Sequence, residues 1–306
     1  MNLENASLLG IDFSSSPSRR KPIAVAVGQW QGAVVAVDGL LSLNTLSEFE
    51  ALMKEGPRVF EKSQATAAQD EAPRFVAAID MPFGLSRQLV EGLKWPGAGR
   101  TDFKAWPEMI NFYAGMSRAQ IREVFKAWCD ARPAGHKFAH RACDGPAGSS
   151  PSMKWVNPPV AYMLHSGAPL LMNAGVHIPG MHRGDKNRIA LETYPGFFAR
   201  KILNRASYKS DDPRKDTPDR RMARSELLCA IEEGMLLGIR AQVRPYLRAR
   251  LLDDVKADHL DALICCLVAA WAAKRADSNF GLPAMTDPVE GWIAGVPPKI
   301  DDSIGR

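Results

Sequence analysis

The sequence predicts an α/β fold in which a mixed five-stranded sheet is flanked by helices and carries an inserted helical or loop lid. Short apolar runs of strand length alternate with longer segments of helical spacing. The first three strand-like runs follow one another closely, as in an antiparallel meander, before the first helix begins. A chain of 306 residues, of which 46% are hydrophobic, is long enough for one large domain with an insertion.

The first part of the chain contains four predicted strands and one helix. The strand-like runs cover residues 8–13, 23–28, 33–37 and 75–80. The second and third runs flank Gly28-Gln29-Trp30-Gln31-Gly32, which predicts a hairpin. Residues 43–54 have helical spacing, with Asn44 or Thr45 as the N-cap. We expect residues 61–73 to form an exposed connection.

The middle of the chain differs in composition from the rest. Residues 95–185 are rich in Gly, Pro, Trp, Met and His, with one clear helix at 117–132 and another beginning at Ala161. A long irregular segment inside a compact domain is usually functional. We therefore expect residues 95–186 to be an insertion or lid between the fourth and fifth strands.

The last third returns to the alternation of strand and helix. Residues 187–193 read as the fifth strand, and Pro195 suits the first position of the helix that follows. A second helix begins with Thr217 as N-cap, and the last long helix covers residues 255–276. The sequence thus predicts a single domain over residues 1–277 and a C-terminal tail over 278–306.

Composition narrows the class of protein. The net charge of +5 permits a polyanionic partner without requiring one. The cysteines are odd in number, irregularly spaced and without a CxxC pair, which is typical of reduced thiols. Neither a secretory signal nor a bilayer-spanning run is visible, because the longest apolar run, at 262–273, is too short. We expect a cytoplasmic protein with no membrane partner.

Acidic residues stand where predicted strands end and where the last helix begins. Asp12, Asp80 and Glu192 each end an apolar run, and Asp258 and Asp261 lie three residues apart at the start of the final helix. A carboxylate beside a buried strand is costly unless something pairs it. If strands one, four and five are parallel neighbours, their three acids lie at one sheet edge, where α/β folds bind ligands.

The acidic pair on the last helix completes this cluster. Spacing of three residues places Asp258 and Asp261 on one helix face, about one turn apart. Mg²⁺ or Mn²⁺ favours such carboxylates, and two ions about 3.5–4 Å apart support phosphodiester hydrolysis. We therefore expect metal ligands that are also catalytic at Asp12, Asp80, Asp258 and Asp261. Glu192 is a further catalytic candidate.

Four short sequences carry a resemblance to a known family. GIDFSSS, AIDMPFG, ALETYPG and DHLDAL, in this order, resemble sequences of domain of unknown function 429 (DUF429), a family described as predicted RNase H-like nucleases. The order of strands and acids also resembles the RNase H-like fold in its RuvC-type arrangement. The resemblance spans about residues 8–275, loosely so between 95 and 185. It implies that fold and a metal-dependent nuclease acting on DNA or RNA.

Each acid also has a purely structural interpretation. Asp80, before Met81-Pro82, is a residue type common in turns and helix caps. Asp258 and Asp261 are favoured in a first helical turn by the helix dipole. Glu192 could merely accept from N–H groups of the following helix.

Basic residues are concentrated in two segments that suggest a nucleic-acid partner. Residues 200–224 contain nine Lys or Arg against four Asp, including Lys215, Arg220 and Arg221. Arg240, Arg244 and Arg248 repeat every four residues and would form one basic stripe if helical. Such residues suit a phosphate backbone, although an ordinary solvated helix face explains them equally well.

A possible zinc site lies in the insertion. Its ligands would be Cys129, His136, His140 and Cys143. Alternatively, residues 132–135 form a simple turn, and Arg141 and Asp144 are polar lid groups facing the substrate. No Walker A loop, GxGxxG or GxSxG sequence is present.

Two other functions compete with the nuclease. The first is a nucleotide-binding phosphotransferase or ATPase of the actin-like kinase superfamily, with residues 10–16 as its first phosphate loop. That class normally needs a duplicated domain with a second loop, which the sequence lacks. The second is a catalytically inert nucleic-acid-binding module.

Overall fold

The computed structural model describes residues 3, 5–57 and 72–298. Seven strands form one mixed sheet in the order β5-β6-β4-β1-β2-β3-β7. They are β1 Ser7–Asp12, β2 Ile23–Gln31, β3 Val34–Leu43, β4 Phe75–Asp80, β5 Val176–His177, β6 Asp185–Glu192 and β7 Arg240–Val243. The α-helices are α1 Leu46–Glu55, α2 Arg87–Gly92, α3 Ala105–Ala114, α4 Arg118–Asp130, α5 Asp144–Ala147, α6 Val160–Ala174, α7 Pro195–Leu203, α8 Pro218–Glu233, α9 Pro245–Asp253 and α10 Asp258–Ala273. Two 3₁₀ helices, η2 and η3, cover Pro213–Lys215 and Ala276–Gly281.

The prediction of an α/β fold with a mixed sheet and flanking helices is confirmed, but the strand number is not. All five predicted strands are present: β1, β2 and β3 pair antiparallel, β4 is parallel to β1, and β6 is parallel to β4. Two short edge strands, β5 and β7, bring the sheet to seven. Strands of two and four residues are too short to produce a readable alternation.

The hairpin is longer than predicted. Residues 28–31 continue β2, and the chain turns at Gly32, whose φ of 60° lies in the left-handed region that glycine tolerates.

The starts of several helices have the residue types that the sequence indicated. Thr45 and Ser117 form capping boxes at α1 and α4, and Thr217 caps α8. Pro195 occupies the first position of α7, as expected.

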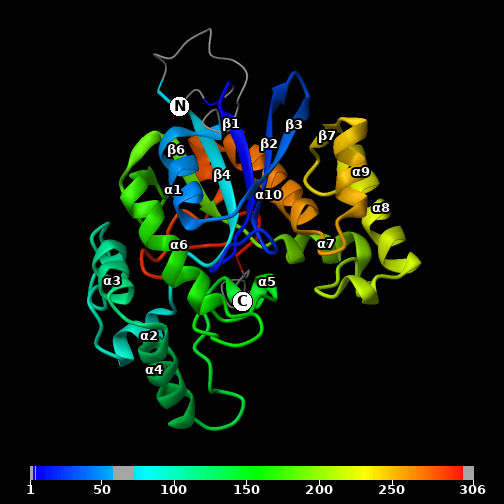
Figure 1. Cartoon of the computed structure of the whole chain (residues 1–306). Coiled ribbons are helices and arrows are strands. Elements are labelled where there is room, and N and C mark those ends of the chain that lie inside the picture. Colours follow the sequence, from blue (N-terminus) through cyan, green and yellow to red (C-terminus); the bar gives the residue numbers. More distant parts are fainter. Residues whose placement is uncertain (1–2, 4, 58–71, 299–306) are drawn as a thin grey trace, which may run out of the picture.

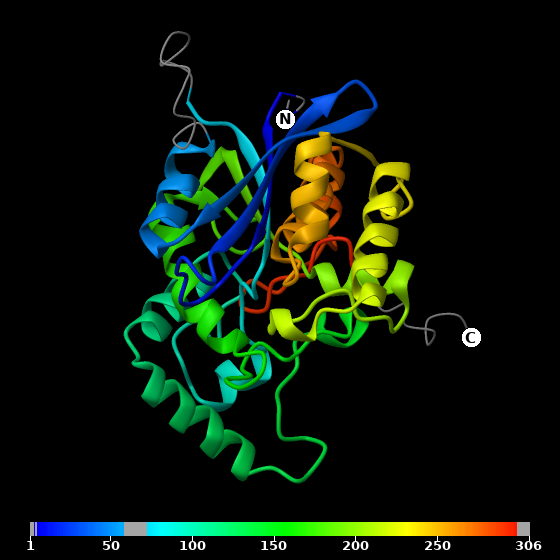
Figure 2. The same cartoon turned by 45° about the vertical axis from the view of Figure 1, so that its right-hand side comes forward.

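Helices cover both faces of the sheet, so the domain has three layers (Figure 1). Alternate residues of β1 show this directly: Leu8 packs in the core with α7, α8 and α10, whereas Leu9 packs in the core with α1, α3 and α6. Figure 2 shows α10 lying along the sheet, with α8 and α9 outside it. A strand buried on both faces explains the continuous apolar run at residues 8–11.

Gly10 allows α10 to lie directly against β1. A Cβ atom at this position would stand 1.9 Å from the carbonyl oxygen of Ala262 and 2.0 Å from the amide nitrogen of Cys266. No side chain fits in that space, so only glycine permits this approach. The close packing places the first turn of α10 beside the carboxyl end of β1.

Part of the predicted insertion belongs to the main core. Within residues 95–186, α3 and α6 contribute buried side chains to the layer that also contains α1. The predicted tail is wrong for residues 278–298, because Val289 and Ala294 are completely buried there. Gly84 accommodates this segment, since a Cβ would lie 2.1 Å from the Val289 carbonyl oxygen. Residues 61–71 of the expected exposed connection and 299–306 of the tail lie outside the described residues.

In the described part of the chain, no helix is both long and apolar enough to cross a lipid bilayer. The predicted core position of the last apolar run is confirmed, because Leu263, Ile264 and Leu267 of α10 are fully buried. All the cysteines are free thiols, as the sequence predicted, at Cys129, Cys143, Cys229, Cys265 and Cys266.

Candidate active site

Asp12 and Asp80 are cross-strand neighbours. They are the last residues of β1 and β4, and the parallel register pairs them directly. Residues two positions before them, Gly10 and Ala78, face α10 or its core layer. Because side chains alternate along a strand, both carboxylates point to that same face. Neighbouring strands lie about 4.8 Å apart, so two acids share one small region of the sheet edge.

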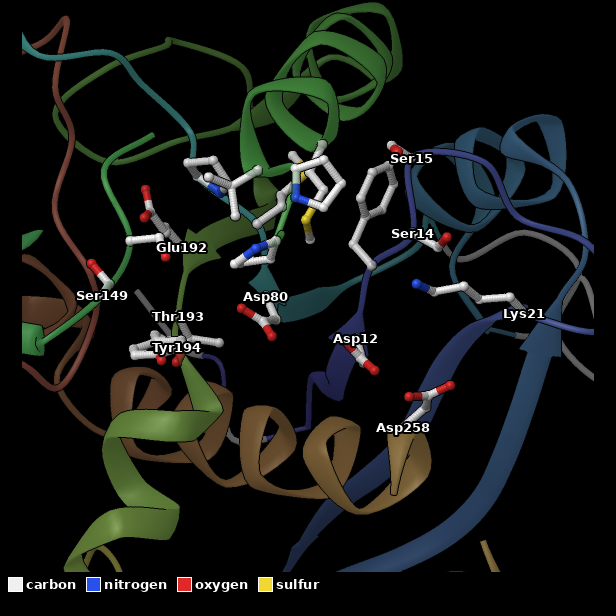
Figure 3. A pocket seen from close by; sticks show the side chains of 18 of the residues that line it. Asp12, Ser14, Ser15, Lys21, Asp80, Ser149, Glu192, Thr193, Tyr194 and Asp258 are labelled. Carbon is white, nitrogen blue, oxygen red and sulfur yellow. The ribbon is translucent and has the colours of Figure 1, made fainter. Parts of the chain in front are cut away.

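The first turn of α10 brings Asp258 and Asp261 to this region. Burial raises the pKa of Asp12 well above its ordinary value, and the charges of Asp261, Asp80 and Asp258 raise it further. Figure 3 shows Asp12, Asp80 and Asp258 around one cavity. Asp80, Asp258 and Asp261 thus lie close enough to Asp12 for their negative charges to act on it.

Three of these aspartates, Asp12, Asp80 and Asp258, have side chains that accept no hydrogen bond from any of the described residues. Burial, followed by the charge of Asp261, raises the pKa of Asp80 from 3.8 to about 7. Burial and the charges of Asp254 and Asp261 raise the pKa of Asp258. Half-buried acids without partners are the feature expected of a site completed by a ligand.

Asp261 differs from the other three because the protein itself neutralises it. The side chain is 1% exposed, and its two oxygens accept from the Tyr208 hydroxyl and the Lys209 ammonium, each at 2.6 Å. The charge of Asp261 in turn raises the pKa of Lys209 far above its ordinary value. Lys209 therefore places a positive charge inside the carboxylate cluster.

Sequence reasoning missed this lysine. Lys209 lies in an irregular segment between α7 and η2, where no periodicity indicates which side chains face the site, and its side chain is 51% exposed. The neighbouring Tyr208 packs on the domain and is 7% exposed. The available signal was the dipeptide Tyr208-Lys209 itself, an aromatic residue and a cation in the loop that follows α7.

Glu192 ends β6 and lines the same pocket as Asp12 and Asp80, and its charge helps to raise the pKa of Asp80, but its carboxylate is paired with a cation of the protein. It pairs in register with Ile79, whose side chain belongs to the core of α1 and α6. Glu192 therefore points to the opposite face of the sheet. There both of its oxygens accept from Arg141, at 2.6 and 2.7 Å, and one also accepts from the amide of Phe83. The alternative that it caps the following helix is not what the structure shows.

Arg141 and Asp144 are likewise not free polar groups of a lid. Arg141 is 3% exposed and donates to Asp144 as well as to Glu192. Asp144 is 1% exposed and accepts additionally from the hydroxyl of Ser149. The three form a buried ion network, one guanidinium between two carboxylates, that ties the start of α5 to the end of β6.

One pocket of about 480 Å³ opens at the sheet edge beside the aspartates. Its polar lining includes Asp12, Asp80 and Asp258 together with three lysines, Lys21, Lys209 and Lys256. Lys21 extends from the β1–β2 connection toward Asp12 and Asp258 (Figure 3). Neither Lys21 nor Lys256 was expected, although both stand near a predicted acid in the sequence. Acids and lysines around one cavity suit an anionic ligand held with a cation.

No group of three or more His, Cys, Asp and Glu side chains gathers closely enough to hold a metal ion in residues 3, 5–57 and 72–298. The four aspartates predicted as metal ligands therefore do not form such a group, and the suggested zinc site is wrong. Cys143 is buried beside Asp144, whereas Cys129 belongs to α4. The intervening chain forms turns instead of bringing His136 and His140 to the two thiols.

The predicted basic stripe is not one helix face. Arg240 belongs to β7, Arg244 is the N-cap of α9, and only Arg248 is inside a helix, where it pairs with Glu232. Arg240 pairs with Val34 at the start of β3. The site lies beyond the opposite end of β3, about 30 Å from Arg240 along that strand. These arginines are not part of the pocket, and a role in nucleic-acid binding stays a prediction.

The second basic segment is largely paired within the chain. Arg221 donates to Asp253 at 2.5 Å, and Arg220 donates to the carbonyl oxygen of Lys215. Arg224, fully buried, forms an ion pair with Asp216. Lys215 ends η2, and contacts of Lys215, Arg220 or Arg221 with nucleic acid also stay a prediction.

The raised pKa of Asp80 predicts a pH-dependent stability without divalent cations. Between pH 4 and pH 7 the folded protein retains a proton on Asp80 that the unfolded chain releases, because the folded pKa is about 7 and the ordinary value 3.8. The contribution of Asp80 to the free energy of unfolding is therefore fully present below pH 4 and is lost as the pH rises to 7. Urea unfolding in EDTA should show Asp80→Asn gaining stability over the wild type as pH rises. A difference that is constant with pH would contradict this.

Comparisons with known proteins provide no relative for this chain. No protein-family model matches it, and no significant match was found among curated proteins or solved structures. The resemblance to DUF429 therefore stays a prediction, and function has to be argued from the site.

Proposed function

We propose that this protein is a metal-dependent phosphodiester hydrolase acting on nucleic acid. The observation that carries the proposal is the pair Asp12 and Asp80, two adjacent acids with raised pKa values and no protein donor among the described residues. They line a pocket that also contains Lys21, Lys209 and Asp258. A phosphate diester with a divalent cation satisfies both the acids and the lysines.

The arrangement of the sheet supports an RNase H-like fold for this domain. Numbered in chain order, the five main strands lie in the order 5-4-1-2-3, with the second antiparallel to both of its neighbours. The aspartates of the first and fourth strands and those of α10 then face one another across the sheet edge. This is the arrangement that the DUF429 resemblance implies.

The donor set fits Mg²⁺ or Mn²⁺, because all of its atoms are carboxylate oxygens and Mg²⁺ is commonly held by one or two carboxylates with water and substrate phosphate. Asp12 and Asp80 would hold it. The sequence suggested two ions, but Asp261 already has Lys209 as its counterion. We therefore propose one divalent cation, with Lys209 as a fixed positive charge. When bound, the cation would polarise a phosphate oxygen of the substrate.

The remaining side chains have separate roles. Asp258 faces the cavity with a raised pKa and is the candidate acceptor for a proton from the attacking water. Lys21 has no ion-pair partner among the described residues and would hold a non-bridging phosphate oxygen. Tyr208 fixes Asp261, and through it Lys209, by a hydrogen bond of 2.6 Å.

Cleavage assays test the proposal. Single-stranded, duplex and branched DNA and RNA should be incubated with Mn²⁺, and we expect cleavage that EDTA abolishes. Asp258→Asn should lower the rate about a hundredfold, since it removes the proton acceptor. Asp253→Asn, an aspartate of α9 whose side chain is 64% exposed, is the matched control and should leave the rate unchanged. Cleavage that persists in EDTA, or that survives Asp258→Asn, would contradict the assignment.

One observation favours the phosphotransferase as a second candidate. Ser14, Ser15 and Lys21 in the β1–β2 connection line the same pocket, as a phosphate loop would. ATP hydrolysis, with and without small hydroxylated acceptors, separates the two functions. ATP turnover without cleavage of any nucleic acid would favour the phosphotransferase.

A further inference from the structure

The pocket at the sheet edge has two chemically different walls. The aspartates and lysines form one, at the ends of β1 and β4 and the start of α10 (Figure 3). The opposite wall is apolar and comes mainly from the loop before α6 and from the first turn of that helix. Its side chains are Phe13, Met81, Pro158, Pro159, Val160 and Met163. A hydrated phosphate alone does not need such a wall.

Phe13 and Met81 of this wall belong to the core, but the part of the wall at residues 158–163 is accessible. Pro158 and Pro159 are exposed, and Val160 and Met163 are half-buried. Val160 and Met163 stand three residues apart, on one face of α6. Exposed apolar surface beside a charged edge is costly in water unless a ligand covers it, and flat aromatic rings are covered well by such side chains.

The size of the pocket restricts what the ligand can be. A volume of about 480 Å³ lies in the range of sites that enclose a single small molecule. In a duplex the phosphates lie outside and the bases are stacked inside, so a base reaches a wall of this kind only when it is unpaired. A single strand presents phosphate and base together.

We propose that the pocket binds one unpaired nucleotide, with its phosphate at Lys21 and at the cation that Asp12 and Asp80 would hold, and its base against Val160 and Met163. The substrate class is then single-stranded nucleic acid or its short fragments. This inference rests on the proposed function for cleavage, although the binding of a nucleotide can be measured without it.

Calorimetric titrations test the pocket directly. The probes are adenosine 5′-monophosphate and inorganic phosphate, each with millimolar Mg²⁺. We expect the nucleotide to bind at least tenfold more tightly than phosphate, since only it reaches the apolar wall. Met163→Gln, which keeps size and charge, should weaken nucleotide binding about fivefold and leave phosphate binding unchanged. Met222→Gln, at a methionine 68% exposed on α8, is the matched control and should change neither.

If Met163→Gln lowers the melting temperature strongly, Val160→Ser at the first position of α6 serves instead, with the same expectation. A nucleotide that binds no more tightly than phosphate would overturn the inference. So would equal effects of the α6 variant and Met222→Gln.

Cleavage rates separate this inference from the function on which it rests. We expect a single strand to be cleaved at least tenfold faster than a duplex of the same sequence, because the duplex must first expose a base. Equal rates on both, without nucleotide binding, would overturn the pocket assignment and leave the hydrolase. Nucleotide binding that depends on Met163, without cleavage of any phosphodiester, would overturn the hydrolase and leave the pocket assignment.

Discussion

Asp12→Asn should abolish cleavage and the response to divalent cations while leaving the protein folded. Asp12 stands at the centre of the cluster, where the charges of Asp261, Asp80 and Asp258 all raise its pKa. Loss of the carboxylate removes a cation ligand worth several kcal/mol in the transition state, so activity should fall at least a hundredfold. Asparagine has nearly the same shape, and it removes a repulsive buried charge. The metal-free variant should therefore be at least as stable as the wild type.

Thermal unfolding gives a second measurement that is independent of the substrate. Millimolar Mn²⁺ present at about 100 times its dissociation constant stabilises a protein by about 2.7 kcal/mol, which for a domain of this size is a rise of roughly 4 °C in melting temperature. This rise should be absent in Asp12→Asn. It should persist in Asp253→Asn, since that carboxylate pairs with Arg221 at 2.5 Å, away from the pocket. A rise of equal size in Asp12→Asn would remove Asp12 from the cation site.

Much of the site was predictable because the ends of buried strands and the starts of helices can be recognised from a few neighbouring residues. The apolar runs that end at Asp12 and Asp80 show buried strands, and turn residues follow each acid. The close helix crossing at Gly10 was not predictable, because a glycine inside a strand has several explanations. The sequence therefore indicated which acids would meet, but not the contact that brings α10 to them.

Glu192 shows what a linear pattern leaves undetermined. It ends an apolar run just as Asp12 and Asp80 do, yet the register of β6 against β4 pairs it with Ile79. Because side chains alternate, one step of register moves a side chain to the other face of a sheet. Register depends on packing of the whole sheet, so no local pattern separates Glu192 from the aspartates.

Lys209 and the arginines between residues 220 and 248 show that charge patterns in the sequence are limited in the same way as the pattern at Glu192. Nine basic residues in one segment suggested a surface for phosphates, but Arg224 is fully buried and Lys209 enters the carboxylate cluster. The four-residue repeat from Arg240 suggested a helix, but a strand and a helix N-cap interrupt it. A count of charged residues in the sequence does not show which of them form ion pairs. In this protein, tertiary contacts determine which basic side chains remain free.

The largest effect on stability is expected for Arg141→Met. Arg141 donates to both oxygens of Glu192 and to Asp144, and all three side chains are at most 4% exposed. Removing the guanidinium leaves two buried carboxylates without their cation, which costs about 3–5 kcal/mol. Urea unfolding should show this loss. Arg221→Met is the matched control, because its ion pair with Asp253 is more than half exposed and should contribute about 1 kcal/mol or less.

A double variant shows that the loss comes from the unpaired charge and not from packing. Adding Glu192→Gln to Arg141→Met removes one buried carboxylate, so the double variant should be more stable than Arg141→Met alone. Glu192→Gln by itself should retain the Mn²⁺-dependent rise in melting temperature, because Glu192 faces the other side of the sheet from Asp12 and Asp80. Loss of that rise in Glu192→Gln would place Glu192 among the cation ligands, beyond the four aspartates that the sequence suggested. Its retention would assign Glu192 a structural role, with the chemistry left to the aspartates.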